Sequence, residues 1–288
     1  MKLGTALRLG RVSNLPTVCT NALAGMALAG GQLAGGTLAL VVLAAALAYT
    51  AGMFLNDAFD ADLDAQSQRF RPIPAGLVTR SAVFAWGYGM LGLSVVLLTI
   101  TGLWSGTGWW SALVGLALAA TIISYNANHK ENLFGPLLMG MCRVLVYFAA
   151  ALAVSTTLPT PLWIGAALLL AHVMGLTYVA KREGAGAVGQ VWPFICLALP
   201  LLFGVVVSLS RPEIIAFIVI LLAADAIAIR WCLRKQPGDI GRAIPMLIAA
   251  ISILDAMLIA NQGQIALAML ALIAFPLTLL LQRWVRGT

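Results

Sequence analysis

The sequence predicts an all-α polytopic membrane protein, a bundle of nine or ten transmembrane helices that forms one domain over residues 1–288. Hydrophobic residues make up 61% of the chain and charged residues only 9%, and the mean hydropathy is +0.98. A water-soluble monomer could not expose so much apolar surface. The apolar stretches are long and continuous rather than short and alternating, which favours membrane-spanning helices over barrel strands.

Ten apolar stretches have the length of about twenty residues that a helix needs to cross a hydrocarbon core of ~30 Å. They lie at residues 14–32, 37–56, 80–103, 108–126, 135–156, 161–180, 190–209, 212–231, 242–260 and 264–283.

Basic residues fall in alternate loops, and this asymmetry predicts the orientation in the membrane. With the N-terminus inside, the loops and the tail on that side hold Arg69, Arg71, Arg80, Lys130, Lys181, Arg182, Arg230, Arg234, Lys235, Arg242, Arg283 and Arg286. The opposite loops hold only Arg211. We therefore expect an integral protein of a bacterial inner membrane, with both termini and the active site on the cytoplasmic side. Membrane topology then explains the net charge of +7 without a nucleic-acid partner.

The stretch NDAFDADLDAQSQRFRPIPAG, residues 56–76, gathers four of the ten acidic residues. If the second helix continues past the end of its apolar stretch, Asp57, Asp60 and Asp64 share one face, and Asn56 joins them. Like charges at this spacing repel one another unless a cation lies between them. Hard oxygen ligands beside a phosphate-binding site suit Mg²⁺. The alternative is a solvated segment whose charges keep the helix end out of the bilayer.

The pattern NDxxDxxxD followed by RPIPxG resembles the first signature of the UbiA superfamily of intramembrane prenyltransferases. The match covers Asn56, Asp57, Asp60, Asp64, Arg71, Pro72, Pro74 and Gly76. RVSNLPTVCTNALAG, with Asn14 and Pro16, resembles the family's first helix, and YNANHKENLFGPLLMGMCR resembles its Tyr-plus-Lys loop and the Gly/Arg-containing helix that follows. RVSNLPT together with YVAKRE resembles a bacterial branch found in the Ebo gene cluster.

The resemblance implies a helical bundle around a central cavity that opens to the bilayer. It also implies Mg²⁺-dependent transfer of an isoprenyl group from a prenyl diphosphate to an acceptor within the membrane. The acceptor stays open among aromatic, cyclitol and sugar-phosphate types.

Two features depart from the family pattern. The family usually has nine spans, one fewer than the ten apolar stretches found here. Its second acidic signature follows the sixth span, where this chain reads TYVAKREGAGAVGQ. Lys181 and Arg182 stand where carboxylates are expected, and Glu183 alone is acidic. Either Lys181 contacts the diphosphate directly beside a single Mg²⁺, or Glu183 recruits a second metal ion.

The candidate site residues fall into three sets. The metal ligands are Asn56, Asp57, Asp60, Asp64 and Glu183. The substrate-binding residues are Asn14, Asn21, Arg71, Lys130, Tyr178, Lys181 and Arg182. The catalytic residues are Tyr125, Arg143 and Lys181.

Each set has a physical reason and a plainer alternative. Cations neutralise the charge of the leaving pyrophosphate, although basic loop residues also simply mark the cytoplasmic side. Tyr125 could present its ring face to an allylic cation or belong to an aromatic belt. Arg143 lies inside a span, where a charge is costly unless it faces a polar cavity or partner. Asn14 and Asn21 share a helix face and could instead form interhelical hydrogen bonds.

Two other classes of function fit parts of the sequence. In a transporter, Arg143, His172, Asp225 and Asp255 would line a pathway, but the strongest polar cluster lies at the membrane edge and no pair of interrupted helices stands out. Without a motif around them, we expect His172, Asp225 and Asp255 to make structural polar contacts. The signature of the CDP-alcohol phosphotransferases is absent. A catalytically altered homologue that only binds lipid is a further alternative.

Overall fold

In the part of the chain that the structure describes, ten helices of 14 residues or more occupy the positions of the ten apolar stretches. The computed structural model describes residues 1–31, 35–128, 134–182, 189–234, 236–285 and 287. The long helices are α2 (Leu15–Leu28), α3 (Gly35–Ser67), α4 (Arg80–Trp104), α5 (Trp110–Asn128), α6 (Gly135–Leu152), α7 (Thr160–Lys181), α8 (Trp192–Ser208), α9 (Ile215–Arg234), α10 (Asp239–Asn261) and α11 (Ile265–Leu281). The short elements are α1 (Leu3–Leu9), η1 (Val12–Asn14) and η3 (Pro212–Ile214).

Seven of the described helical segments are long and apolar enough to cross a membrane, rather than the ten expected. They are α3, α4, α5, α6, α7, α10 and the segment of η3 and α9. The helices α2, α8 and α11 fall short because their regular part is only 14 or 17 residues long. At α2 the chain turns sharply at Arg11, which has a φ of 41°, and the helix ends before Gly30, which has a φ of 71°.

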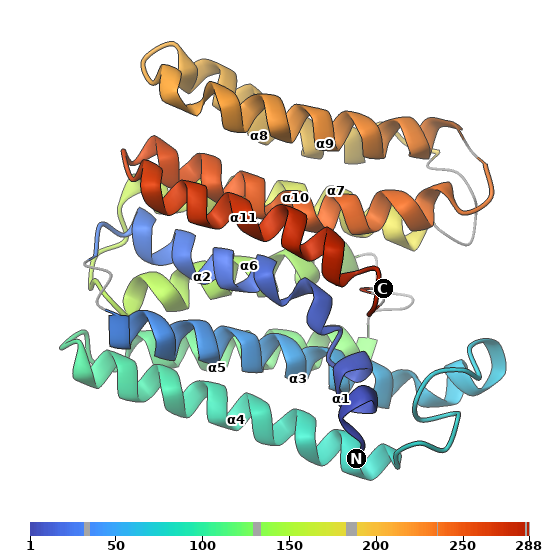
Figure 1. Ribbon diagram of the computed structural model, residues 1–288. Coiled ribbons are helices and arrows are strands. Elements are labelled where there is room, and N and C mark those ends of the chain that lie inside the picture. Colours follow the sequence, from blue (N-terminus) through green and yellow to red (C-terminus); the bar gives the residue numbers. More distant parts are fainter. Residues whose placement is uncertain (32–34, 129–133, 183–188, 235, 286, 288) are drawn as a thin grey trace.

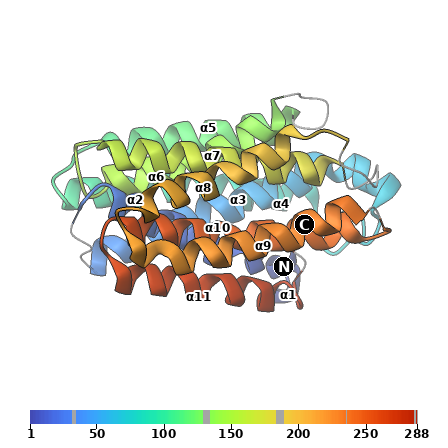
Figure 2. The same cartoon turned by 90° about the horizontal axis from the view of Figure 1, so that it is seen from above.

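The long helices run roughly side by side, and α2 and α10 lie in the middle of the bundle (Figure 1). In that view α8 and α9 form one outer layer, and α3, α4 and α5 form the opposite one. Helix α2 packs against α3, α6, α10 and α11, and α10 also packs against α7 and α9. Figure 2 shows the same bundle from above, with α10 between α3 and α9. The two central helices therefore connect both layers.

Helices α2 and α6 approach closely at Gly25. A Cβ atom on Gly25 would lie closer to the carbonyl oxygen of Tyr147 than nonbonded atoms can approach. Small residues allow such close helix packing in membrane proteins, where van der Waals contact contributes to helix association. This contact fixes the spacing of the two helices that carry Asn21 and Arg143.

Helix α3 continues well past the end of its apolar stretch, as expected. It has 33 residues, a length of ~50 Å at the rise of an α-helix, against ~30 Å for a hydrocarbon core. The chain then reverses through a turn in which Gly76 has a φ of 71°. Figure 1 shows this light-blue end of α3 and the returning loop projecting beyond the other helices. Arg71 returns to the acidic face of α3 through an earlier turn directly after the helix, where its backbone amide donates to the carbonyl oxygen of Gln68 at 3.0 Å.

Candidate active site

The acidic residues of α3 are sorted between two faces of the helix. Asp57, Asp60 and Asp64 are 6%, 7% and 3% exposed, and Asn56 is buried beside them. The side chain of Asp62, between them in sequence, is 81% exposed. The three carboxylates therefore share one helix face, as the sequence predicted, and the structure adds that this face is buried while Asp62 lies at the surface.

Two arginines reach the buried carboxylates from outside α3. The Nη2 atom of Arg11 donates to Oδ1 of Asn56 at 3.1 Å and to Oδ1 of Asp57 at 3.3 Å. The Nη1 atom of Arg71 donates to Oδ1 of Asp57 at 3.2 Å and to Oδ2 of Asp64 at 3.0 Å. Asp57 is thus shared by both guanidinium groups.

A cavity of about 440 Å³ lies beside this cluster and is lined by α2, α3, α5, α6, α7 and α10. The structure brings eight of the predicted site residues into its lining: Asn14, Asn56, Asp60, Asp64, Arg71, Tyr125, Arg143 and Lys181. Asp57 is not among its lining residues. Much of the remaining wall is apolar, with residues such as Val18, Leu118, Ile122, Val146 and Ile251.

Helix α7 presents one of its faces to the cavity through Val173, Thr177 and Lys181. Tyr178 and Arg182 lie outside the lining, because each is one residue, and so about 100°, further around the helix. The Nη2 atom of Arg182 donates to the hydroxyl of Tyr178 at 2.9 Å. Of the three candidates on this segment that the structure describes, only Lys181 lines the cavity.

Arg143 lines the cavity from α6 and has neutral hydrogen-bond partners on α2. Its Nη1 atom donates to Oδ1 of Asn21 at 2.7 Å, and its Nη2 atom donates to Oγ1 of Thr17 at 3.1 Å. The guanidinium carbon also lies 5.5 Å from the centroid of the Tyr49 ring, within the range of a cation–π contact. Asn21 itself is fully buried and makes the interhelical hydrogen bonds that were the alternative to a substrate contact.

Asn14 holds the C-terminal segment against the cavity. Its Nδ2 atom donates to the carbonyl oxygen of Gly287 at 2.9 Å and to the hydroxyl of Tyr49 at 3.1 Å. Its Oδ1 atom accepts from Nε2 of Gln282, also at 2.9 Å.

Two of the predicted site residues, Lys130 and Glu183, lie outside the described residues.

The donor set suits a magnesium ion that shares its coordination with a substrate. Among the described residues, no three His, Cys, Asp or Glu side chains are grouped closely enough to hold a metal ion by themselves. Asp60 and Asp64 are two carboxylates one helical turn apart at the cavity wall. Mg²⁺ is typically bound by one or two carboxylates, waters and substrate phosphate oxygens. Asp60 and Asp64 line the cavity, whereas Asp57 does not and Asn56 carries no charge, so Asp60 and Asp64 are the better placed ligands.

Sequence reasoning missed several polar residues of the cavity. Arg11, Tyr49, Gln68, Asn126 and Thr177 all line it. Arg11 is the first residue of RVSNLPT, so the signal was present, but only Asn14 and Pro16 were singled out in that segment. Tyr49 and Thr177 lie inside apolar stretches and carry no motif.

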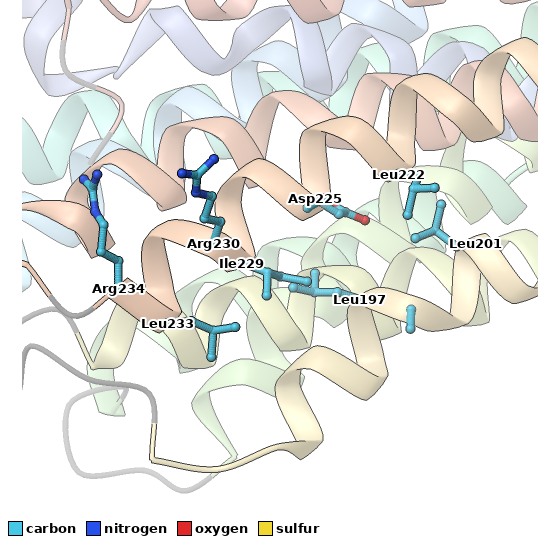
Figure 3. A pocket seen from close by; sticks show the side chains of 10 residues that line it. Leu197, Leu201, Leu222, Asp225, Ile229, Arg230, Leu233 and Arg234 are labelled. Carbon is cyan, nitrogen blue, oxygen red and sulfur yellow. The ribbon is translucent and has the colours of Figure 1, made fainter.

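A second cavity, of about 700 Å³, lies along α8 and α9 (Figure 3). Its wall is formed mainly by apolar residues such as Leu197 and Leu222, and Asp225 and Arg230 also line it. Asp225 is 1% exposed, and neither carboxylate oxygen has a hydrogen-bond partner within the described chain. The expected polar contact of Asp225 is therefore wrong. The expectation is confirmed for His172, whose Nε2 atom lies 3.0 Å from the carbonyl oxygen of Leu247.

A sequence profile of the UbiA prenyltransferase family matches residues 18–186, more than half of the chain. The chain therefore belongs to this family of integral membrane proteins, which confirms the resemblance noted in the sequence.

Two curated relatives match parts of the chain. The digeranylgeranylglyceryl phosphate synthase of Metallosphaera sedula is 28% identical over 149 residues, which are 51% of this chain and 50% of that protein. The protoheme IX farnesyltransferase of Rhizobium etli is 36% identical over 110 residues, which are 38% of this chain and 32% of that protein. The chain thus spans about half the length of these relatives or less.

Solved structures share the fold over most of their length. A UbiA homologue from Aeropyrum pernix K1 has a TM-score of 0.65 at 16% identity, covering 87% of this chain and 97% of that one. A UbiA homologue from Archaeoglobus fulgidus bound to GPP and Mg²⁺ has a TM-score of 0.61 at 16% identity, covering 91% and 99%. The predicted fold class, an all-α membrane bundle, is confirmed.

Proposed function

We propose that this protein transfers an isoprenyl group from a prenyl diphosphate to an acceptor inside the membrane, with Mg²⁺ as cofactor. One observation carries the proposal: Asp60, Asp64, Arg71 and Lys181 line the same cavity, whose remaining wall is largely apolar. That combination fits an amphiphile with a strongly anionic head and a hydrocarbon tail. The family relationship and the homologue bound to GPP and Mg²⁺ support the same substrate class.

The polar residues would hold the diphosphate. When bound there, Mg²⁺ would be held by Asp60 and Asp64, beside Asn56 and Asp57, and would offset negative charge on the phosphate oxygens. Arg71 offers a planar guanidinium to those oxygens and Lys181 a compact ammonium. As the bond between the allylic carbon and oxygen breaks, the electron pair leaves with pyrophosphate, and preorganised cations stabilise that charge.

The largely apolar part of the cavity would hold the isoprenyl chain and exclude water. Exclusion of water matters because an allylic cation that meets water becomes an alcohol instead of a transfer product. Tyr125 lines this cavity from α5, and an aromatic ring face attracts a cation more strongly where water is absent. The acceptor's nucleophilic atom would then form the new bond and lose its proton.

Lys181 is proposed to replace a metal-held contact to the diphosphate, so that a single Mg²⁺ suffices. It lines the cavity at the C-terminal end of α7, on the segment where the family's second acidic signature would stand. A catalytically altered homologue that only binds lipid would keep the cavity but release no pyrophosphate.

The test is a product analysis with purified protein in nanodiscs. Radiolabelled geranylgeranyl diphosphate and Mg²⁺ are supplied with an aromatic acid, a cyclitol, a sugar phosphate or a single-chain glyceryl phosphate lipid. The last probe is chosen because relatives of this chain are digeranylgeranylglyceryl phosphate synthases. Pyrophosphate release that needs one acceptor, together with a labelled product, supports transfer. A parallel assay uses the same protein in sealed proteoliposomes. Uptake of label into their lumen without pyrophosphate release would instead indicate transport.

A further inference from the structure

Asp255 is a fully buried carboxylate in the C-terminal half of α10, away from the predicted signatures. Three side chains donate hydrogen bonds to it. The hydroxyl of Tyr147 on α6 donates to Oδ1. Oγ1 of Thr20 and Nδ2 of Asn21, both on α2, donate to Oδ2 at 2.5 Å and 2.8 Å. Both carboxylate oxygens are therefore fixed by donors from two neighbouring helices.

Asn21 connects this carboxylate to the cavity. Its Nδ2 atom faces Asp255, while its Oδ1 atom accepts from Nη1 of Arg143 at 2.7 Å. A side-chain amide has a donor end and an acceptor end, and the surrounding network sets which end points where. Because Asp255 can only accept when ionised, it holds the donor end of Asn21. The acceptor end is thereby directed at the guanidinium.

The charges explain why such a relay is needed. Arg143 lies inside a membrane-spanning helix, where an uncompensated cation is costly. Within the part of the chain that the structure describes, its contacts with Asn21, Thr17 and the ring of Tyr49 are all with neutral groups. Asp255 supplies the opposite charge without contacting Arg143, because Asn21 lies between the two side chains. This arrangement leaves the cavity-facing side of the guanidinium for a ligand.

We infer that Asp255 is a positioning residue, which acts through Asn21 to hold the guanidinium of Arg143 in one orientation at the cavity wall. Tyr147 and Thr20 fix the carboxylate, and the close contact of Gly25 with Tyr147 fixes the spacing of α2 and α6. The use of Arg143 in prenyl transfer rests on the proposed function. Its orientation by Asp255 does not.

The structural part is tested by nuclear magnetic resonance of the full chain, labelled with ¹⁵N-arginine in detergent micelles. The Arg143 signals are assigned with the variant Arg143→Lys. We expect separate Nη1 and Nη2 signals in the wild-type protein, because both groups are held. In Asp255→Asn the two signals should merge, with rotation of the guanidinium about tenfold faster or more. Asp225→Asn is the matched control, because Asp225 is equally buried and lies outside this network.

A second variant covers the case in which Asp255→Asn does not fold. Asn21→Ala removes the relay and leaves Asp255 with its contacts to Tyr147 and Thr20, so the same merging is expected. Unchanged, separate Arg143 signals in either folded variant overturn the inference. A loss of thermal stability alone does not support it, since a purely structural role would also cause that.

Turnover of geranylgeranyl diphosphate in the acceptor panel tests the link to the reaction. Asp255→Asn and Arg143→Gln should lower turnover by similar factors, and the double variant should be no slower than Arg143→Gln, because the two residues act as a unit. If the losses of turnover in the two single variants multiplied in the double variant, the link to the reaction would be overturned. If the wild-type protein transfers nothing, the proposed function fails, and the resonance experiment still decides the positioning role.

Discussion

The guanidinium of Arg11 lies 3.3 Å from the carboxylate of Asp57, although 46 residues of chain separate them. The turn between α1 and α2, where Arg11 has a φ of 41°, directs this side chain toward α3. The same guanidinium group holds Asn56. Arg11 thus holds the proposed metal-binding face of α3 from a segment that precedes its partners by 45 and 46 residues.

Replacing Arg11 with glutamine should lower prenyl diphosphate turnover by ~10- to 100-fold. The reason is the loss of charge-assisted hydrogen bonds worth ~1.5 to 3 kcal/mol, which leaves Asp57 with Arg71 alone. The measurement is steady-state pyrophosphate release. Arg8→Gln is the control, because Arg8 is exposed on α1. Equal rates for the two variants would contradict a role of Arg11 in the site.

Lys181→Ala should lower turnover by ~10²-fold or more, as the removal of a transition-state donor does. Arg182→Ala, which removes the neighbouring charge but lies outside the cavity lining, should change turnover little. A structure with a diphosphate analogue should contain one Mg²⁺, at Asp60 and Asp64. Two Mg²⁺ ions, or wild-type kinetics for Lys181→Ala, would rule out the single-metal proposal.

Gly25→Ala should destabilise the fold by ~1 to 3 kcal/mol, the usual cost of forcing extra atoms into a packed interior. The added methyl group would collide with the backbone of Tyr147, and α2 and α6 would have to separate. Gly92→Ala on α4 is the control, because no atom lies within 4 Å of its added Cβ. Thermal unfolding in detergent gives the comparison, and equal midpoints for the two variants would refute the packing contact.

Both chain termini are expected on the cytoplasmic side, as the distribution of basic residues predicts. Reporters that are active only in the periplasm should therefore be inactive when fused after Thr288 or before Met1. Activity at the C-terminal fusion alone would require an odd number of spans and favour the nine that the family usually has.

The helices could be predicted from the sequence because their cause is local. Continuous apolar stretches of about twenty residues must form helices in lipid, and all ten appear near the expected positions. The number of spans was predicted less accurately than the helix positions, because the lengths of α2, α8 and α11 depend on where turns begin. Helix α2 ends at Leu28, before Gly30 with its φ of 71°, although the apolar stretch was expected to run to residue 32.

The candidate site was predicted where a motif marked it and missed where only packing does. The shared face of Asp60 and Asp64 follows from helical periodicity. Lys181 was noticed because it stands where the family's second acidic signature is expected. Tyr49, Thr177 and the relay from Asp255 to Arg143 depend on how α2, α3, α6, α7 and α10 come together. These residues lie far apart in the sequence, and no sequence pattern indicates that they meet in the fold.

Mg²⁺ titration of pyrophosphate release in three aspartate variants tests the central claim most directly. Asp60, Asp62 and Asp64 lie on one helix, but only Asp62 is exposed, where it pairs with Arg80 at 2.9 Å. Asp60→Ala and Asp64→Ala should abolish release at ordinary Mg²⁺ concentrations while the protein stays folded, because the ion loses a ligand. Asp62→Ala should retain the wild-type rate. Normal turnover in Asp60→Ala or Asp64→Ala would contradict a Mg²⁺-dependent prenyl transfer at this site.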